Sequence, residues 1–160
     1  MPDLPNHSDL PLQRRFAPEG RCFGCGPANA AGLRLESRPV GDEVVATWRG
    51  RPEHEAFPGF LNGGIVATLL DCHGNWTALH ALITRDRLDR PPSTVTAEIR
   101  VRFLRPTPSD RPVRLRGRVV ELGANRATVE TVVEADGRTT AEGRATFVVV
   151  GEGHPAYGRW

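Results

Sequence analysis

The chain has 160 residues, of which 39% are hydrophobic and 25% charged, and this fits one globular domain with its own core. All 21 basic residues are arginines, and a protein without lysine cannot form a Schiff base, hold pyridoxal phosphate or build a P-loop. The net charge is only +2 and the basic residues are dispersed among 19 acidic ones, so we expect no nucleic-acid partner.

The proline-rich residues 1–20 contain no apolar run long enough for a signal peptide. No later stretch approaches the roughly 18 apolar residues of a membrane span. We therefore expect a soluble, cytoplasmic protein with no membrane partner. We divide the chain into a flexible N-terminal tail (1–20), one domain (21–150) and a C-terminal tail (151–160).

Two of the three cysteines lie in the sequence "CFGC", as Cys22 and Cys25. They could form half of a zinc site, but a second pair is missing. Cys72 and His73 are neighbours about 100° apart on the predicted helix, so both cannot point at one metal. We therefore expect a tight turn with small buried thiols, and no metal ligands.

The predicted elements follow in chain order. Residues 32–50 read as two short strands with a turn at 40–42, and residues 62–83 read as one long helix with Asn62 as its N-cap. Four further strands are expected at 94–104, 113–122, 127–135 and 139–150, separated by turn sequences that suit an antiparallel meander. This order predicts an α+β fold in which a curved antiparallel β-sheet wraps one long central helix.

The helix carries two distinct rows of side chains. The broad apolar face comprises Ile65, Leu69, Trp76 and Leu79. The second row is small or polar throughout: Gly64, Ala67, Thr68, Asp71, Gly74, Asn75 and Ala78. Such a row allows close approach of another backbone, a partner helix or a ligand.

Asp71 is the ionisable residue of the second row, and two interpretations compete. It is either paired with donors in a dimer interface, or it is a general base or nucleophile in a cleft. The glycines Gly63 and Gly64 leave the N–H groups of the first helical turn uncovered, which suits a developing oxyanion. A carboxylate and an anion-stabilising site on one helix favour acyl-transfer chemistry.

Three segments resemble a known family, the hotdog-fold acyl-CoA thioesterases of the phenylacetate-pathway (PaaI-like) type. "NGGIVATLLD" is similar to that family's H-G-G followed by an acidic residue, "TVTAEIRVRFLRPTP" is similar to the strand after the helix, and "ADGRTTAEGRATFVV" is similar to the closing hairpin. The resemblance runs from about residue 22 to 149. It implies an acyl-CoA thioesterase that needs no metal or redox cofactor.

The resemblance also implies roles for single residues. Asp71 is the catalytic carboxylate, whose role as general base or nucleophile stays open, and the Gly63 N–H polarises the thioester carbonyl. Thr96 helps to hold the attacking water, or is an ordinary strand threonine. Asn62 stands where the family often has histidine, and its role is polarising or orienting.

Further residues are candidates for substrate binding. Gly64 belongs to the open helix start, and His54 either supplies an upstream polar contact or is a solvated loop residue. Arg102 and Arg105 are candidates for the phosphates of coenzyme A. His7, His73, His80 and His154 match no family position, and we assign them to the core or surface.

Gly63 and Asp71 are eight residues apart, about 12 Å along one helix, so one copy cannot bring both to one carbonyl. We therefore expect a homodimer, or a homotetramer built as a dimer of dimers, with shared active sites. Two alternatives stay open: a hotdog enoyl-CoA hydratase or dehydratase, and a non-catalytic acyl-CoA-binding dimer.

Overall fold

The computed structural model describes residues 7–159. Within that range one antiparallel sheet contains six strands in the order β1-β2-β6-β7-β8-β5. Its strands are β1 (Arg38–Val40), β2 (Glu43–Arg49), β5 (Thr94–Phe103), β6 (Pro112–Leu122), β7 (Arg126–Ala135) and β8 (Arg138–Val149). Each lies where the sequence predicts a strand. The antiparallel meander expected of the last four strands holds for β6, β7 and β8 only, because β5 pairs with β8 at the sheet edge and not with its chain neighbour β6.

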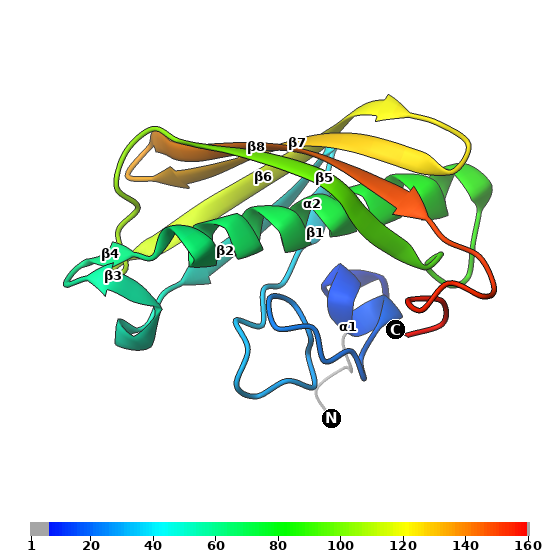
Figure 1. The fold of residues 1–160 in the computed structure, drawn as a ribbon, viewed down its shortest axis with the longest axis horizontal. Coiled ribbons are helices and arrows are strands. Elements are labelled where there is room, and N and C mark those ends of the chain that lie inside the picture. The colour runs from blue at the N-terminus through cyan, green and yellow to red at the C-terminus, as the bar shows by residue number, and fades with distance from the viewer. Residues whose placement is uncertain (1–6, 160) are drawn as a thin grey trace.

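The long helix α2 (Gly63–Asp86) runs across one face of the curved sheet (Figure 1). The Asn62 side chain accepts a hydrogen bond from the Gly64 N–H, as expected of an N-cap. At the other end Arg87 takes a left-handed conformation with φ 53°, and its N–H donates to the carbonyl of Ile83. The predicted α+β architecture, one long helix wrapped by an antiparallel sheet, is confirmed.

Packing differs from the helical-wheel prediction on both faces of α2. Gly74 and Ala78, which the sequence analysis placed in the second, small or polar row, are buried against the sheet, and a Cβ on Gly74 would lie 3.1 Å from the Phe147 ring. The face of α2 that packs against the sheet therefore carries small side chains as well as large ones. Trp76 was placed on the broad apolar face, but its Nε1 donates to Cys25 Sγ in the N-terminal segment, at 3.3 Å.

The N-terminal segment covers the side of α2 away from the sheet, so that the helix lies between two layers (Figure 1). Part of the predicted tail is packed here, because residues 12–16 form the short helix α1 (Leu12–Phe16) and Leu12 is buried. The apolar spacing of Leu12 and Phe16 places both on one side of that helix.

A buried polar network ties this segment to the core. Gln13 Nε2 donates to Ser37 Oγ at 3.0 Å, and Ser37 Oγ lies 2.9 Å from His73 Nδ1. His73 Nε2 lies 2.9 Å from the Val44 carbonyl oxygen, so Nε2 carries the proton and donates, and Nδ1 accepts from Ser37. His73 is therefore a core residue, and burial lowers its pKa to about 4.

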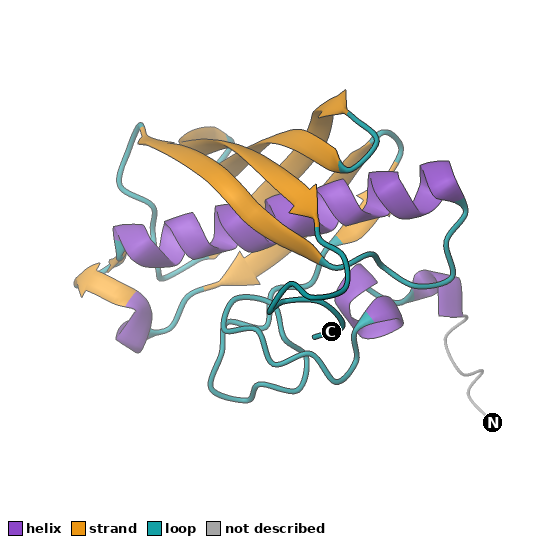
Figure 2. Cartoon of the chain, turned by 45° about the vertical axis from the view of Figure 1, so that its right-hand side comes forward, coloured by secondary structure: helices purple, strands orange, loops and turns teal. Residues whose placement is uncertain are grey.

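A second small unit lies at the start of α2, and the sequence analysis missed it. A 3-10 helix (Pro52–His54) leads into the two-stranded hairpin of β3 (Glu55–Phe57) and β4 (Phe60–Leu61). Figure 2 shows this unit beside the first turn of α2. Its strands are too short to give a period-2 signal. No helix in residues 7–159 combines the length and apolarity needed to cross a bilayer.

Candidate active site

The side chains of Asp71 and Thr96, to which the family resemblance gives roles in one site, are in contact. Thr96 Oγ1 donates to Asp71 Oδ1 at 2.8 Å, joining α2 to strand β5. Asp71 is half-buried and Thr96 is exposed. Within residues 7–159 the Asp71 carboxylate forms no ion pair, although the chain contains 21 arginines. It can therefore accept a further hydrogen bond from water or substrate.

A β-bulge turns Thr96 toward the helix. The pairing of β5 with β8 shifts between Thr96, opposite Phe147, and Glu98, opposite Thr146. In a regular strand Thr96 would share a face with Glu98, Arg100 and Arg102. The extra residue changes the alternation, so that Thr96 points to Asp71 while those charged side chains lie on the other face.

A second hydrogen bond joins α2 and β5 one helical turn after Asp71. Thr94 Oγ1 donates to Asn75 Oδ1 at 2.7 Å. Asn75 follows Asp71 by four residues, about 6 Å along the helix, and Thr94 precedes Thr96 by two residues, about 6.6 Å along the strand. The two spacings match, so α2 and β5 are held in register beside Asp71. Sequence reasoning missed the Thr94–Asn75 pair. It could have been found from two intervals, four residues between Asp71 and Asn75 on the helix and two residues between Thr94 and Thr96 on the strand.

Burial raises the pKa of Asp71 above its usual value. The hydrogen bond from Thr96 opposes this effect, and negative charge on the nearby Cys22 adds to it. A carboxylate with a raised pKa is a better proton acceptor at neutral pH, provided that it stays ionised.

The start of α2 is where the sequence predicts an anion-stabilising N–H group. Gly63 is the first helical residue, so its N–H has no acceptor within the helix. The Gly64 N–H is used by the cap, since it donates to Asn62 Oδ1 at 2.8 Å. Gly63 is thus the better candidate donor of the two glycines. Asn62 serves the helix through its oxygen and keeps its amide N–H₂ for other contacts.

His54 is not a solvated loop residue, since its side chain is only 6% exposed. Its Nδ1 accepts from the Arg51 N–H at 3.0 Å, and its ring lies against Trp48 with the centroids 5.3 Å apart. Its carbonyl oxygen accepts from the Asn62 N–H at 2.8 Å. These contacts make His54 a support for the helix start.

An apolar cavity of about 310 Å³ adjoins Gly63. Three aromatic rings line it, those of Phe57, Phe60 and Phe103, and Arg105 lies at its edge. The Phe103 and Phe57 side chains are 57% and 58% exposed, unusually high values for phenylalanine. The helix start thus combines an available N–H with an apolar surface.

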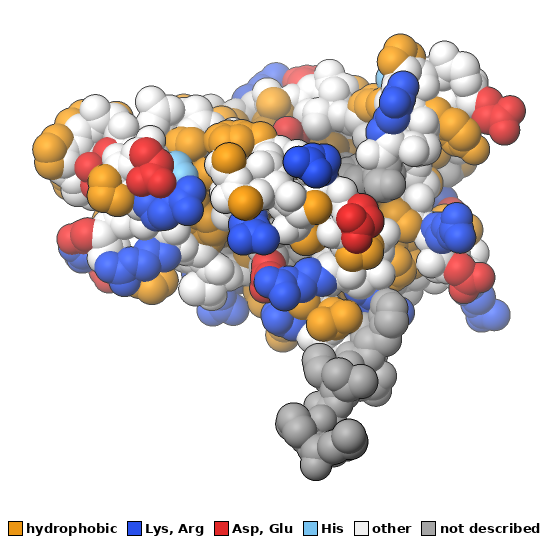
Figure 3. Space-filling model, turned by 90° about the horizontal axis from the view of Figure 1, so that it is seen from below, with side chains coloured by type: hydrophobic (Ala, Val, Ile, Leu, Met, Phe, Trp, Pro, Cys, Tyr) orange, Lys and Arg blue, Asp and Glu red, His pale blue; other side chains and the backbone are white. Residues whose placement is uncertain are grey.

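The two arginines proposed for phosphate binding lie in different places. Arg102 is on the outer face of the sheet, where Nη1 donates to Glu142 Oε1 at 2.7 Å, and it does not meet Asp71 or Gly63 within one chain. Arg105 donates to the Thr139 carbonyl at 2.9 Å and borders the apolar cavity. On the face seen in Figure 3, basic side chains are scattered among acidic and apolar ones. Arg105 is therefore the better placed of the two.

Three thiols cluster at Cys72, the residue that follows Asp71. Cys72 joins Cys22 and Cys25, and their sulfur atoms all lie within 4.8 Å of one another. Hydrogen bonds, chiefly from Cys25 and Cys72, hold the pKa of Cys22 well below its ordinary value. The "CFGC" turn is confirmed and Cys25 is buried as expected, but Cys22 is exposed. The sequence offers no second cysteine pair, and His73 does point away from Cys72 as expected; the fold nevertheless brings Cys72 alone to the turn as a third thiol.

Comparison with known proteins places the chain in a family. Residues 58–142, which include Gly63, Asp71 and Thr96, match the model of the thioesterase superfamily. The chain belongs to the thioesterase superfamily. Its long helix and curved antiparallel sheet form the hotdog fold of these thioesterases, and the resemblance found in the sequence is confirmed. No protein of curated function matches the chain significantly.

Solved thioesterase structures share this fold. A thioesterase superfamily protein from Shewanella loihica is 30% identical, with a TM-score of 0.62 over 78% of this chain and 98% of that one. A phenylacetic acid degradation-related protein from Ralstonia eutropha is 23% identical, with a TM-score of 0.65 over 86% and 98%. A hypothetical thioesterase solved with coenzyme A, from Streptococcus pneumoniae, is 21% identical, with a TM-score of 0.59 over 73% and 86%.

Proposed function

We propose that this thioesterase superfamily member hydrolyses an acyl-CoA to the free acid and coenzyme A, with Asp71 as the catalytic carboxylate. The observation that carries the proposal is the hydrogen bond of 2.8 Å from Thr96 to a half-buried Asp71 that forms no ion pair among the described residues. A structural aspartate at such a position would be expected to pair with arginine. The coenzyme A bound to the Streptococcus pneumoniae protein supports this substrate class.

In the proposed reaction water adds to the thioester carbonyl, the C–S bond breaks, and the thiol of coenzyme A leaves with a proton. Asp71 either removes the proton from water or attacks the carbonyl itself. The Gly63 N–H stabilises the oxyanion that forms at the carbonyl oxygen. The Asn62 amide orients the acyl group, and Arg105 contacts a phosphate of coenzyme A.

A second copy of the chain completes the site. Gly63 and Asp71 are separated by about 12 Å along α2, too far for one carbonyl to reach both. Strand β5 is an edge of the sheet, and its Ile99 and Phe103 side chains are 37% and 57% exposed although they alternate toward the helix side. Pairing of two β5 edges covers these side chains and brings Gly63 of one subunit near Asp71 of the other.

An acyl-CoA panel tests this function. Short, medium, long and aromatic acyl-CoAs are incubated with the protein, and free thiol is measured. We expect thiol release with at least one class, and a loss of at least ~10²-fold in turnover for Asp71→Asn. Asp86→Asn is the matched control, because Asp86 lies on the same helix and forms only an exposed ion pair with Arg85. Equal activity of the two variants would exclude Asp71 from catalysis.

The same panel separates the two alternatives. A hydratase would change the absorbance of an enoyl-CoA without releasing thiol, and a binding protein would bind acyl-CoA without turnover. A single turnover in ¹⁸O-labelled water then distinguishes the two roles of Asp71. A nucleophilic Asp71 forms a mixed anhydride, and when water then attacks the Asp71 carbonyl the acid product carries an unlabelled Asp71 oxygen and the label stays on Asp71. A general base puts the labelled water oxygen into the acid and leaves Asp71 unlabelled.

A further inference from the structure

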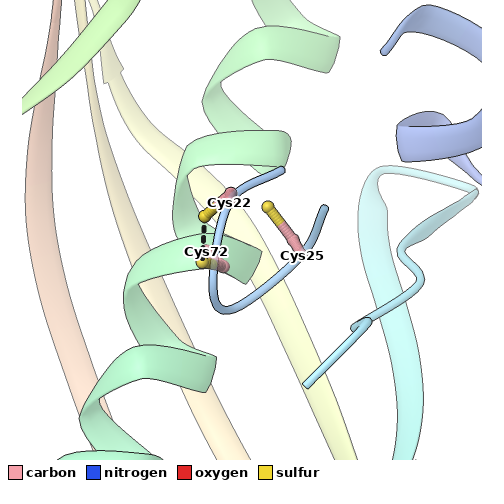
Figure 4. Close-up of side chains that lie close together, drawn as sticks. All are labelled: Cys22, Cys25 and Cys72. Atoms are coloured by element: carbon pink, nitrogen blue, oxygen red, sulfur yellow. Dashed lines mark hydrogen bonds between the residues drawn. The ribbon is translucent and has the colours of Figure 1, made fainter. Parts of the chain in front are cut away.

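The three cysteines form a compact cluster between the N-terminal segment and α2. Cys22 and Cys25 come from the loop before β1, and Cys72 comes from the middle of α2 (Figure 4). The Sγ atoms of Cys22 and Cys72 are 3.7 Å apart, and all three sulfur atoms lie within 4.8 Å of one another. This cluster takes no part in the proposed hydrolysis.

The local structure brings the loop unusually close to the helix. A Cβ on Gly24 would lie 2.8 Å from the Thr68 methyl carbon and closer still to Cys72 Sγ, so glycine is required there. The main chain of Gly24 and Cys25 helps to lower the pKa of the Cys22 thiol. Trp76 Nε1 donates to the Cys25 sulfur at 3.3 Å. N–H donors directed at sulfur are the surroundings that support metal-bound thiolates.

The sulfur spacing fits a tetrahedral ion. Zinc–sulfur bonds of about 2.3 Å at a tetrahedral centre place two sulfur atoms about 3.8 Å apart. The Cys22–Cys72 separation of 3.7 Å matches this value, and the Cys25 sulfur lies within 4.8 Å of both others, so a shift of about 1 Å at most is needed. A disulfide would instead require the two sulfur atoms to approach to about 2.05 Å.

The surroundings also offer room for a fourth ligand and balancing charge. A cavity of about 280 Å³ is lined by Cys22 and Cys25, and Arg21 and Arg159 lie along it. Three thiolates around a divalent ion leave one negative charge, which these two arginines can offset. His73 cannot be the fourth ligand, because Ser37 and Val44 occupy its two ring nitrogens.

We propose that Cys22, Cys25 and Cys72 bind one zinc ion, whose fourth position faces this cavity. The ion fastens the "CFGC" loop to α2 at the residue next to Asp71. The ion has no step in the proposed hydrolysis, so the site is tested by metal content and spectroscopy.

The test uses the full chain without a metal-binding tag, purified with a phosphine reductant and without chelator. We expect elemental analysis to give one zinc per chain. Replacement of zinc by Co²⁺ should give sulfur-to-cobalt charge-transfer absorption and the intense visible bands of a tetrahedral site.

Serine variants test whether the thiols are the zinc ligands. Cys22→Ser is the first, because Cys22 is exposed and its replacement should leave the fold intact, and Cys72→Ser is the second. Both should lose the stoichiometric zinc and the cobalt spectrum. Thr68→Val is the matched control, since Thr68 packs against the same loop without offering a thiol, and it should keep both.

Three results would overturn the proposal. The first is a folded chain with three free thiols and no zinc. The second is a disulfide between two of the cysteines, seen as a loss of two mass units in the absence of metal. The third is zinc that persists in both serine variants.

Discussion

Removal of the Thr96 hydroxyl should both slow the enzyme and change its response to pH. Thr96→Val keeps the branched shape that suits strand β5 but deletes the 2.8 Å hydrogen bond to Asp71. A hydrogen bond to a buried charged group contributes about 1.5–3 kcal/mol, and we discount this to about 1 kcal/mol because Thr96 is exposed in the single chain. The expected loss in kcat is therefore roughly fivefold.

The direction of the pH effect follows from the opposing influences on Asp71. Burial raises its pKa and the Thr96 hydrogen bond lowers it, so the variant should have a higher Asp71 pKa than the wild type. Activity that needs the ionised carboxylate is lost as pH falls through that pKa. The acidic limb of kcat/KM against pH should thus move to higher pH in Thr96→Val.

Thr94→Val provides the matched control for this measurement. It deletes the equivalent hydrogen bond of 2.7 Å, but to the uncharged Asn75. Its acidic limb should stay in place, even if loosened packing lowers kcat. An unmoved limb in Thr96→Val, or an equal shift in both variants, would refute the assignment of the limb to Asp71.

Three further predictions concern stability and the helix start. The pKa of His73 is about 4 in the folded protein and about 6.5 in the unfolded chain, so the unfolded state binds the proton first as pH falls through this range. The free energy of unfolding, measured by urea titration, should therefore decrease by up to roughly 3 kcal/mol. His73→Gln should reduce this pH dependence. Gly117→Ala should lower stability by about 1–3 kcal/mol in thermal unfolding, because the new Cβ would lie 3.3 Å from the His73 ring and closer to Thr77, whereas Gly151→Ala, in open space, should not. Asn62→Asp should keep the helix cap and melting temperature but reduce turnover, because a carboxylate cannot donate to substrate; full activity would assign Asn62 to capping alone.

Local sequence signals predicted most of the fold. The helix and the strands of the large sheet lie within a few residues of their expected positions, because uninterrupted apolar periodicity and turn residues mark them. Asn62 was recognised as a cap because its side chain suits the role without tertiary context. Asp71 was recognised because a charged residue in an apolar helix requires an explanation.

The features that sequence reasoning missed depend on contacts between distant segments. The bulge between Thr96 and Glu98 reverses which strand residues face the helix, and no local pattern announces it. Cys72 meets Cys22 across 50 residues of sequence. The placing of Gly74 against the sheet follows from the position of the Phe147 ring, which only the assembled sheet defines.

The shared site between two subunits is the central claim, and subunit mixing tests it most directly. Gly63→Pro removes the N–H donor at a first-turn position that tolerates proline, and Asp71→Asn removes the carboxylate. Each variant alone should be nearly inactive. The two variants are unfolded and refolded together in equal amounts, and about half of the dimers that form should be mixed. Each mixed dimer should have one intact site and one site that carries both substitutions. Two differently tagged Asp71→Asn chains, mixed in the same way, should stay inactive. The account predicts recovery of roughly a quarter of wild-type activity in the first mixture; an inactive mixture in which native mass spectrometry shows mixed dimers would contradict it.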